Sequence, residues 1–133
     1  MCSLLLIAHA PLATALQAVA RHAFPDCARQ LAALDVTPNM SIEDVLEAVR
    51  PLLAREGQAE TLILTDVLGA TPCNAALRLV DDVHVRLLAG VNVPMLWRSL
   101  CYSNEPLDQL VQRARSGGIS GIVPGIAPHS SRP

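Results

Sequence analysis

Two chemically active side chains each follow an apolar run in this sequence. His9 follows residues 4–8 (LLLIA), and Asp66 follows residues 61–65 (TLILT). Short runs of mainly apolar residues are typical of strands that are covered on both faces of a parallel sheet. In open α/β sheets, ligands and chemistry gather at the carboxyl ends of the strands. We therefore predict that His9 and Asp66 meet at that edge of a sheet.

A histidine held in this way can carry a phosphoryl group. One ring nitrogen has to face solvent, and the other has to be held by an acceptor, which Asp66 can supply. The incoming negative charge also needs stabilisation, and free backbone N–H groups before a helix can provide it. We predict His9 and Asp66 as the catalytic pair. The predicted phosphoryl-binding residues are Leu68, Gly69, Ala70, Thr71 and Asn74.

Each of these residues also has an ordinary structural interpretation. A histidine after an apolar strand is often a satisfied edge residue, and an aspartate there is often a turn former. Thr71 and Pro72 together are typical of the N-cap and first position of a helix. A capping role would occupy the Thr71 hydroxyl. Only the pairing of His9 with Asp66 at two strand ends favours chemistry over these alternatives.

Strand and helix patterns alternate along the chain. Ser41 and Asp44 have the spacing of a capping box, and Pro51 predicts a kink or break over residues 47–50. Gly57 predicts the end of that helix, and Asn104 the cap of the last one, with Gly117 and Gly118 as its stop. The predicted strands are residues 4–9, 29–36, 61–66, 83–91 and 119–123, and the predicted helices are residues 12–23, 42–53, 71–80, 94–100 and 104–116.

This alternation predicts an α/β fold with three layers, a doubly wound and mainly parallel sheet. A flavodoxin-like strand order 2-1-3-4 would make the first and third strands neighbours, which is the arrangement that brings His9 to Asp66. Residues 1–123 are predicted to form one domain. Residues 124–133 are rich in proline and serine and predict a flexible tail.

Composition narrows the function classes. The ten basic residues are all arginines scattered along the 133-residue chain, and the net charge of −2 favours no nucleic acid. Charged residues make up 17% against about 25% in typical domains, which favours self-association. No apolar run is long enough for a membrane span, and the N-terminus lacks signal-peptide features. The four cysteines form no C-x-x-C pair, so we expect reduced thiols in the cytoplasm and no metal cluster.

Residues 4–12, 64–76 (LTDVLGATPCNAA) and 89–100 (AGVNVPMLWRSL) carry a family resemblance. Their most specific pieces are T-D-x-x-G-x-T-P-x-N-x-A and A-G-V-N-x-P-M-L. They resemble the mannose-type enzyme IIA domain of the bacterial phosphoenolpyruvate-dependent sugar phosphotransferase system. The resemblance extends over residues 3–123.

The resemblance implies a phosphotransferase that works without a metal or organic cofactor. It implies that His9 accepts the phosphoryl group from the histidine-containing phosphocarrier protein and passes it to a IIB-type domain. Asp66 would pair with the imidazole, and the loop from Gly69 to Thr71 would surround the phosphoryl group. The family is a cytoplasmic homodimer that can be linked peripherally to a membrane permease. Residues 119–123 would form a strand that crosses to the partner's sheet.

Three positions depart from the family pattern. Ala8 replaces a common Thr or Ser, and Ala10 and Ala70 replace common glycines. None of these changes removes a group that the transfer chemistry requires. They keep open a slower reaction, or a regulatory module whose partner choice depends on phosphorylation of His9 without sugar transport.

Other users of similar folds fit less well. A phosphoryl donor to a dihydroxyacetone kinase uses this fold, but the T-P-x-N loop fits the sugar system better. Residues 10–14 lack the Ser/Thr/Gly-rich phosphate loop of a flavodoxin. A receiver domain would end its first strand in an acidic pair for Mg²⁺ rather than in His9. A histidine phosphatase or mutase would need an arginine beside His9, where Ala8 and Ala10 stand.

Overall fold

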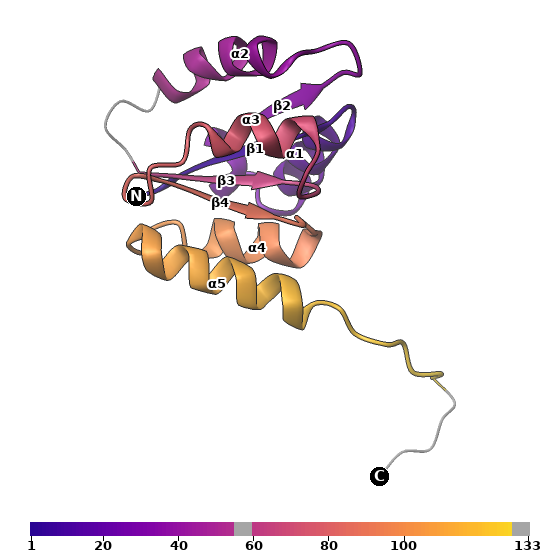
Figure 1. Cartoon of the computed structure of the whole chain (residues 1–133). Helices are drawn as coiled ribbons and strands as arrows, with labels where there is room; N and C mark the ends of the chain where they lie inside the picture. The colour runs from indigo at the N-terminus through magenta and orange to yellow at the C-terminus, as the bar shows by residue number, and fades with distance from the viewer. Residues whose placement is uncertain (55–59, 129–133) are drawn as a thin grey trace.

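The computed structural model describes residues 1–54 and 60–128 of the chain (Figure 1). Its centre is a four-stranded sheet in the order β2-β1-β3-β4, in which every neighbouring pair is parallel. The predicted α/β class and strand order are therefore confirmed. The elements are β1 (Ser3–His9), α1 (Leu12–Ala23), the 3-10 helix η1 (Cys27–Gln30), β2 (Ala32–Val36), α2 (Ile42–Ala54), β3 (Thr61–Thr65), α3 (Thr71–Leu77), β4 (Val85–Ala89), α4 (Val93–Cys101) and α5 (Leu107–Ser120).

Alternation along the central strands divides the core into two halves. Leu4 and Leu6 of β1 pack with buried residues of α1, α4 and α5, whereas Leu5 and Ile7 pack with residues of α2 and α3. Successive side chains of a strand point to opposite faces, so a strand that is apolar throughout needs cover on both sides. Figure 1 shows α2 and α3 on one face of the sheet and α4 and α5 on the other. The result is the predicted three-layer fold.

The predicted capping box starts α2. The Ser41 amide donates to the Asp44 carboxylate at 3.0 Å, and the Asp44 amide donates to the Ser41 hydroxyl at 3.1 Å. The predicted break before Pro51 is wrong, because α2 continues to Ala54. Glu47 and Pro51 are both exposed, so water can reach the carbonyl that loses its N–H donor. The predicted helix end at Gly57 lies outside the described residues.

The second and fourth strands are shorter than predicted. Residues 29 and 30 belong to η1, so β2 begins only at Ala32. Before β4, the Asp81 carboxylate accepts hydrogen bonds from the amides of Val83, His84 and Val85 at 2.7–2.9 Å. These bonds lower the pKa of Asp81 to about 2. A turn organised by one carboxylate thus occupies the start of the predicted fourth strand.

Two glycines near the C-terminus pack against α4 instead of ending a helix. A Cβ atom on Gly117 would lie 2.5 Å from Cγ of Arg98, and one on Gly118 would lie 3.0 Å from Cε of Met95. A side chain on Gly117 would collide with Arg98, and one on Gly118 would press against Met95. Both glycines thus let α5 lie close to α4, and the helix continues through them to Ser120. The predicted helix stop is therefore wrong. The predicted Asn104 cap is also wrong, because α5 begins at Leu107 after Pro106.

The predicted strand over residues 119–123 is absent from the described chain. Residues 119 and 120 belong to α5, and residues 121–123 form no strand. The segment after α5 extends away from the body of the molecule (Figure 1). Of the predicted tail, residues 124–128 follow this exposed path, and residues 129–133 lie outside the described part. Within residues 1–54 and 60–128, no helix combines the length and apolarity needed to cross a membrane.

Candidate functional site

The carboxyl ends of β1 and β3 bring His9 and Asp66 into direct contact. The register pairs Ile7 with Thr65, so Asp66 directly follows β3 beside the end of β1. The Asp66 carboxylate lies 2.7 Å from Nδ1 of the His9 ring and accepts the His9 backbone N–H at 3.1 Å. The predicted contact between the two side chains is present. The Asp66 carboxylate therefore holds both the ring and the backbone of His9.

The geometry of this pair selects one tautomer of the His9 ring. Burial raises the pKa of Asp66, but the hydrogen bonds from the His9 ring and from backbone amides lower it more, so the pKa stays below its usual value. An ionised carboxylate only accepts hydrogen bonds, so Nδ1 of the ring carries the proton. In the neutral ring, Nε2 then holds the free electron pair. The His9 side chain is 50% exposed and the Asp66 side chain is 15% exposed. A partner protein can therefore reach the His9 ring.

The loop after β3 presents unpaired backbone amides beside this pair. Asp66 accepts the Val67 amide at 3.0 Å, and Gly69 has a φ of +91°, which glycine adopts without strain. Among the described residues, no acceptor pairs with the amides that follow. Such a cluster of N–H groups attracts anions. The unpaired amides are those of Leu68, Gly69, Ala70 and Thr71.

Thr71 and Asn74, the two remaining predicted phosphoryl-binding residues, lie in the first turns of α3. Ala70, not Thr71, is the N-cap of α3, and it makes no side-chain cap bond. The Thr71 hydroxyl makes no hydrogen bond within the described chain and is therefore available to a ligand. Asn74 donates to the Gly69 carbonyl at 3.4 Å, so its side chain steadies the loop.

The departures at Ala8 and Ala10 differ in their surroundings. Ala8 is fully buried in the core half formed with α1, α4 and α5. A hydroxyl at this position would therefore lie inside the core. Ala10 is exposed immediately after His9. Of these two alanines, only Ala10 therefore lies at the surface of the site.

Sequence reasoning missed one carboxylate at the same edge of the sheet. Asp35, next to last in β2, accepts the Thr14 amide at 3.0 Å and the Thr14 hydroxyl at 2.6 Å. The available signal was the acidic residue near the end of an apolar strand, which is the pattern that pointed to Asp66. The strand pattern around Asp35 is weak, because leucine and alanine dominate it rather than valine and isoleucine.

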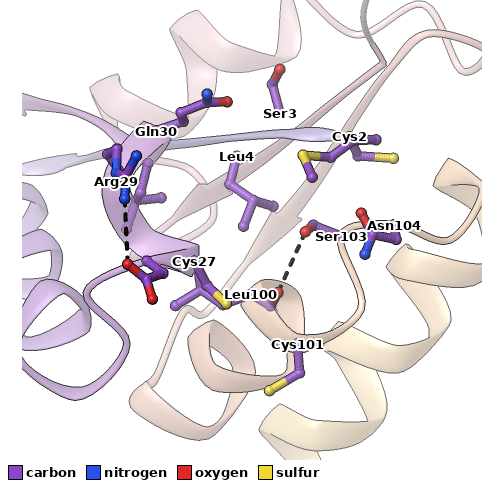
Figure 2. A pocket seen from close by; sticks show the side chains of 13 residues that line it. Cys2, Ser3, Leu4, Cys27, Arg29, Gln30, Leu100, Cys101, Ser103 and Asn104 are labelled. Carbon is purple, nitrogen blue, oxygen red and sulfur yellow. Dashed lines mark hydrogen bonds and ion pairs between the residues drawn. The ribbon is translucent and has the colours of Figure 1, made fainter.

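One cavity of the described chain lies far from this pair. It has a volume of about 310 Å³ and is lined by residues at the amino end of β1, in η1 and at the end of α4. Figure 2 shows Cys2, Cys27 and Cys101 among its side chains. His9 stands at the opposite end of β1, so this cavity takes no part in the chemistry of the pair. Among residues 1–54 and 60–128, no three His, Cys, Asp or Glu side chains are grouped to hold a metal ion.

Comparison with known proteins decides the family. The sequence model EIIA-man, described as the PTS system fructose IIA component, matches residues 3–114. The chain belongs to this family. The resemblance to mannose-type IIA domains of the sugar phosphotransferase system (PTS) is thereby confirmed.

Individual relatives agree with this family. The chain is 34% identical over 93 residues to the PTS system mannose-specific EIIAB component of Escherichia coli (strain K12), a match that spans 67% of this chain and 29% of that protein. It is also similar to the crystal structure of EIIA from Streptococcus agalactiae, with a TM-score of 0.84 and 25% identity over 93% of this chain and 97% of that one. The mannose/sorbose-specific IIA subunit of Enterococcus faecalis shares the fold, with a TM-score of 0.87 and 23% identity over 97% and 98% of the two chains.

Proposed function

We propose that this IIA domain accepts a phosphoryl group on Nε2 of His9 from the histidine-containing phosphocarrier protein and passes it to a IIB-type domain. The observation that carries this proposal is the 2.7 Å contact between the Asp66 carboxylate and Nδ1 of His9. It fixes the tautomer in which Nε2 is nucleophilic, on a half-exposed ring. The predicted cytoplasmic location is part of this proposal.

The transfer balances without any group beyond the two histidines and the phosphoryl. The Nε2 electron pair of His9 attacks phosphorus, a P–N bond forms, and the P–N bond on the carrier histidine breaks. The carrier nitrogen keeps the electron pair of that broken bond. Because Nδ1 keeps its proton, the phosphorylated ring gains positive charge, which the Asp66 carboxylate compensates. Transfer to the IIB-type domain is the same exchange with His9 as the leaving group.

The loop after β3 supports the same proposal from the side of the phosphoryl group. The phosphoryl oxygens carry negative charge, and the unpaired amides of Leu68, Gly69 and Ala70 can donate hydrogen bonds to them. The Thr71 amide and hydroxyl add two further donors. Asn74 acts indirectly through its bond to Gly69. Donors that are fixed before the reaction stabilise charge that develops during it.

Labelling tests the proposal directly. We expect incubation with phosphoenolpyruvate, enzyme I and the phosphocarrier to give a stoichiometric, acid-labile phosphoryl adduct, measured by intact mass before and after acid treatment. Omission of the phosphocarrier is the control and should give no adduct. A folded protein that takes up no phosphoryl group under complete conditions would contradict the proposal.

A regulatory module is the second candidate function. The His9 ring is exposed, and so are the apolar side chains of Val67 and Leu68 in the loop that follows Asp66, so a partner can bind these side chains. In that case phosphorylation of His9 would change which partner is bound, and no phosphoryl group would move onward. Transfer from labelled protein to a IIB-type domain separates the two functions.

We also propose a homodimer, in which the last turn of α5 and the segment after it pair with a second copy. Its apolar side chains are exposed in the single chain, at 60% for Ile119, 78% for Ile122, 71% for Val123 and 63% for Ile126. Apolar side chains gathered at this density usually mark an interaction surface.

Truncation tests this dimer. We expect the full chain to sediment as a dimer and a chain ending at residue 121 to sediment as a monomer, because the truncation removes three of these four side chains. A chain ending at residue 128 is the matched control and should remain dimeric. A monomeric full chain at micromolar concentration would contradict the proposed dimer.

A further inference from the structure

A second carboxylate flanks β1 on the side opposite to Asp66. The neighbours of β1 are β3, which leads into Asp66, and β2, which carries Asp35. In the register of β1 and β2, Asp35 pairs with Ala8, the residue before His9. The two strands beside the histidine thus each supply one acidic side chain at this edge.

The Asp35 carboxylate caps α1 from outside the helix. Helix α1 has Pro11 at its N-cap, no side-chain cap of its own and no acidic residue in its first turn. Thr14, the third residue of α1, donates its amide to Asp35 at 3.0 Å and its hydroxyl at 2.6 Å. Within the described chain, no arginine forms an ion pair with Asp35, so Thr14 accounts for its side-chain contacts. A carboxylate on the third amide is the interaction that an N-cap residue normally provides.

This cap controls the chain that leaves His9. Only Ala10 and Pro11 separate His9 from α1, and the Ala10 amide donates to the Val36 carbonyl at 2.9 Å. The path of the chain after His9 is therefore tied to β2 twice, once through Val36 and once through Asp35. With so short a link, the position of the first turn of α1 determines the direction in which the chain leaves the histidine.

The cap also leaves two helix amides unused. Asp35 takes the Thr14 amide, while the amides of Leu12 and Ala13 have no acceptor among the described residues. They belong to the end of α1 that begins beside His9. Free amides at a helix start, together with the helix dipole, attract negative charge. These amides can interact with a phosphoryl group on His9 only if the first turn of α1 is correctly positioned.

We propose that Asp35 is a positioning residue for phosphoryl transfer at His9. Through Thr14 it fixes the first turn of α1, and with it the chain after His9 and the free amides of Leu12 and Ala13. This inference rests on the proposed function of His9. It assigns to Asp35 no contact with the phosphoryl group.

Substitutions at both ends of the contact test this role. Asp35→Ala should lower the rate constant of phosphoryl transfer by about tenfold, with little change in the KM for the phosphocarrier, because misplacement of reacting groups costs rate more than binding. Asp35→Asn should restore most of the rate, since its amide oxygen still accepts from Thr14. Thr14→Val should lower the rate and Thr14→Ser should restore it.

Asp81→Ala provides the matched control. Asp81 also caps backbone amides, but before β4 at the other end of the sheet. We expect this variant to lose stability in urea unfolding while it keeps the transfer rate of the unaltered chain. If Asp81→Ala slows transfer as much as Asp35→Ala, the effect is general destabilisation and the inference is overturned. It is also overturned if Asp35→Ala transfers at the unaltered rate.

A readout without transfer separates this inference from the proposed function. In NMR spectra, Asp35→Ala should shift or broaden the His9 Nδ1–H signal and the amide signals of Leu12 and Ala13, and Asp81→Ala should leave them in place. If the unaltered chain accepts no phosphoryl group, the proposed function fails, and these signals still decide whether Asp35 positions His9. Unchanged signals in Asp35→Ala would overturn the positioning role.

Discussion

His9→Ala is expected to abolish acceptance of the phosphoryl group from the phosphocarrier, leaving no acid-labile adduct at any incubation time. The reason is that the nucleophile itself is removed, and alanine offers no atom that can form the P–N bond. The fold should survive, because the His9 side chain is half exposed and lies at the end of β1. Intact-mass analysis after the complete labelling reaction measures the result.

His22→Ala is the matched control for this substitution. His22 is an exposed histidine in the last turn of α1, away from the strand ends. It should label as fully as the unaltered chain. A His9→Ala protein that still acquires one acid-labile phosphoryl group would show that another histidine is the acceptor.

Asp66→Asn is expected to slow phosphoryl uptake by about 100-fold or more while leaving the fold intact, as judged by circular dichroism. An asparagine amide can donate to Nδ1 of His9, which would move the ring proton to Nε2 and block the nucleophile. It also lacks the charge that compensates the phosphorylated ring. Rapid-quench measurement of single-turnover uptake gives the rate.

The pH dependence of Asp66 provides a second check. Its pKa is lowered in the folded chain, so its contribution to stability is present above the usual carboxyl pKa and is lost as pH falls through the lowered value. Urea unfolding at neutral pH and at pH about 3 should therefore show a smaller pH effect in Asp66→Asn than in the unaltered chain. An Asp66→Asn variant with an unaltered uptake rate would show that the contact with His9 is structural only.

The sheet order and the central contact were predictable because they follow from long, regular signals. Apolar runs ending in His9 and Asp66 indicate buried parallel strands, and the alternation with helices favours the 2-1-3-4 order. The Ser41–Asp44 box was also readable, because both of its hydrogen bonds lie within one turn of the chain. In each case, nearby residues contain most of the information.

The errors arose where tertiary packing decides the local structure. Gly117 has the sequence features of a helix stop, but its role is to admit the side chain of Arg98 from α4. The cap of α1 comes from Asp35 on another element, so no local pattern around Pro11 predicts it. The N-cap of α3 is Ala70, whose backbone is extended, and Thr71 is the first helical residue. The residue types alone do not determine at which of these two residues the helix begins.

Identification of the phosphorylated atom tests the central claim most directly. The claim is that Asp66 holds Nδ1 of His9 and leaves Nε2 to react. Two-dimensional ¹⁵N–¹H spectra of the protein labelled through the phosphocarrier distinguish the two ring nitrogens by their couplings to the ring protons. We predict phosphorus on Nε2 of His9 with a proton on Nδ1. Phosphorus on Nδ1 of His9, or on any other residue, would contradict the account.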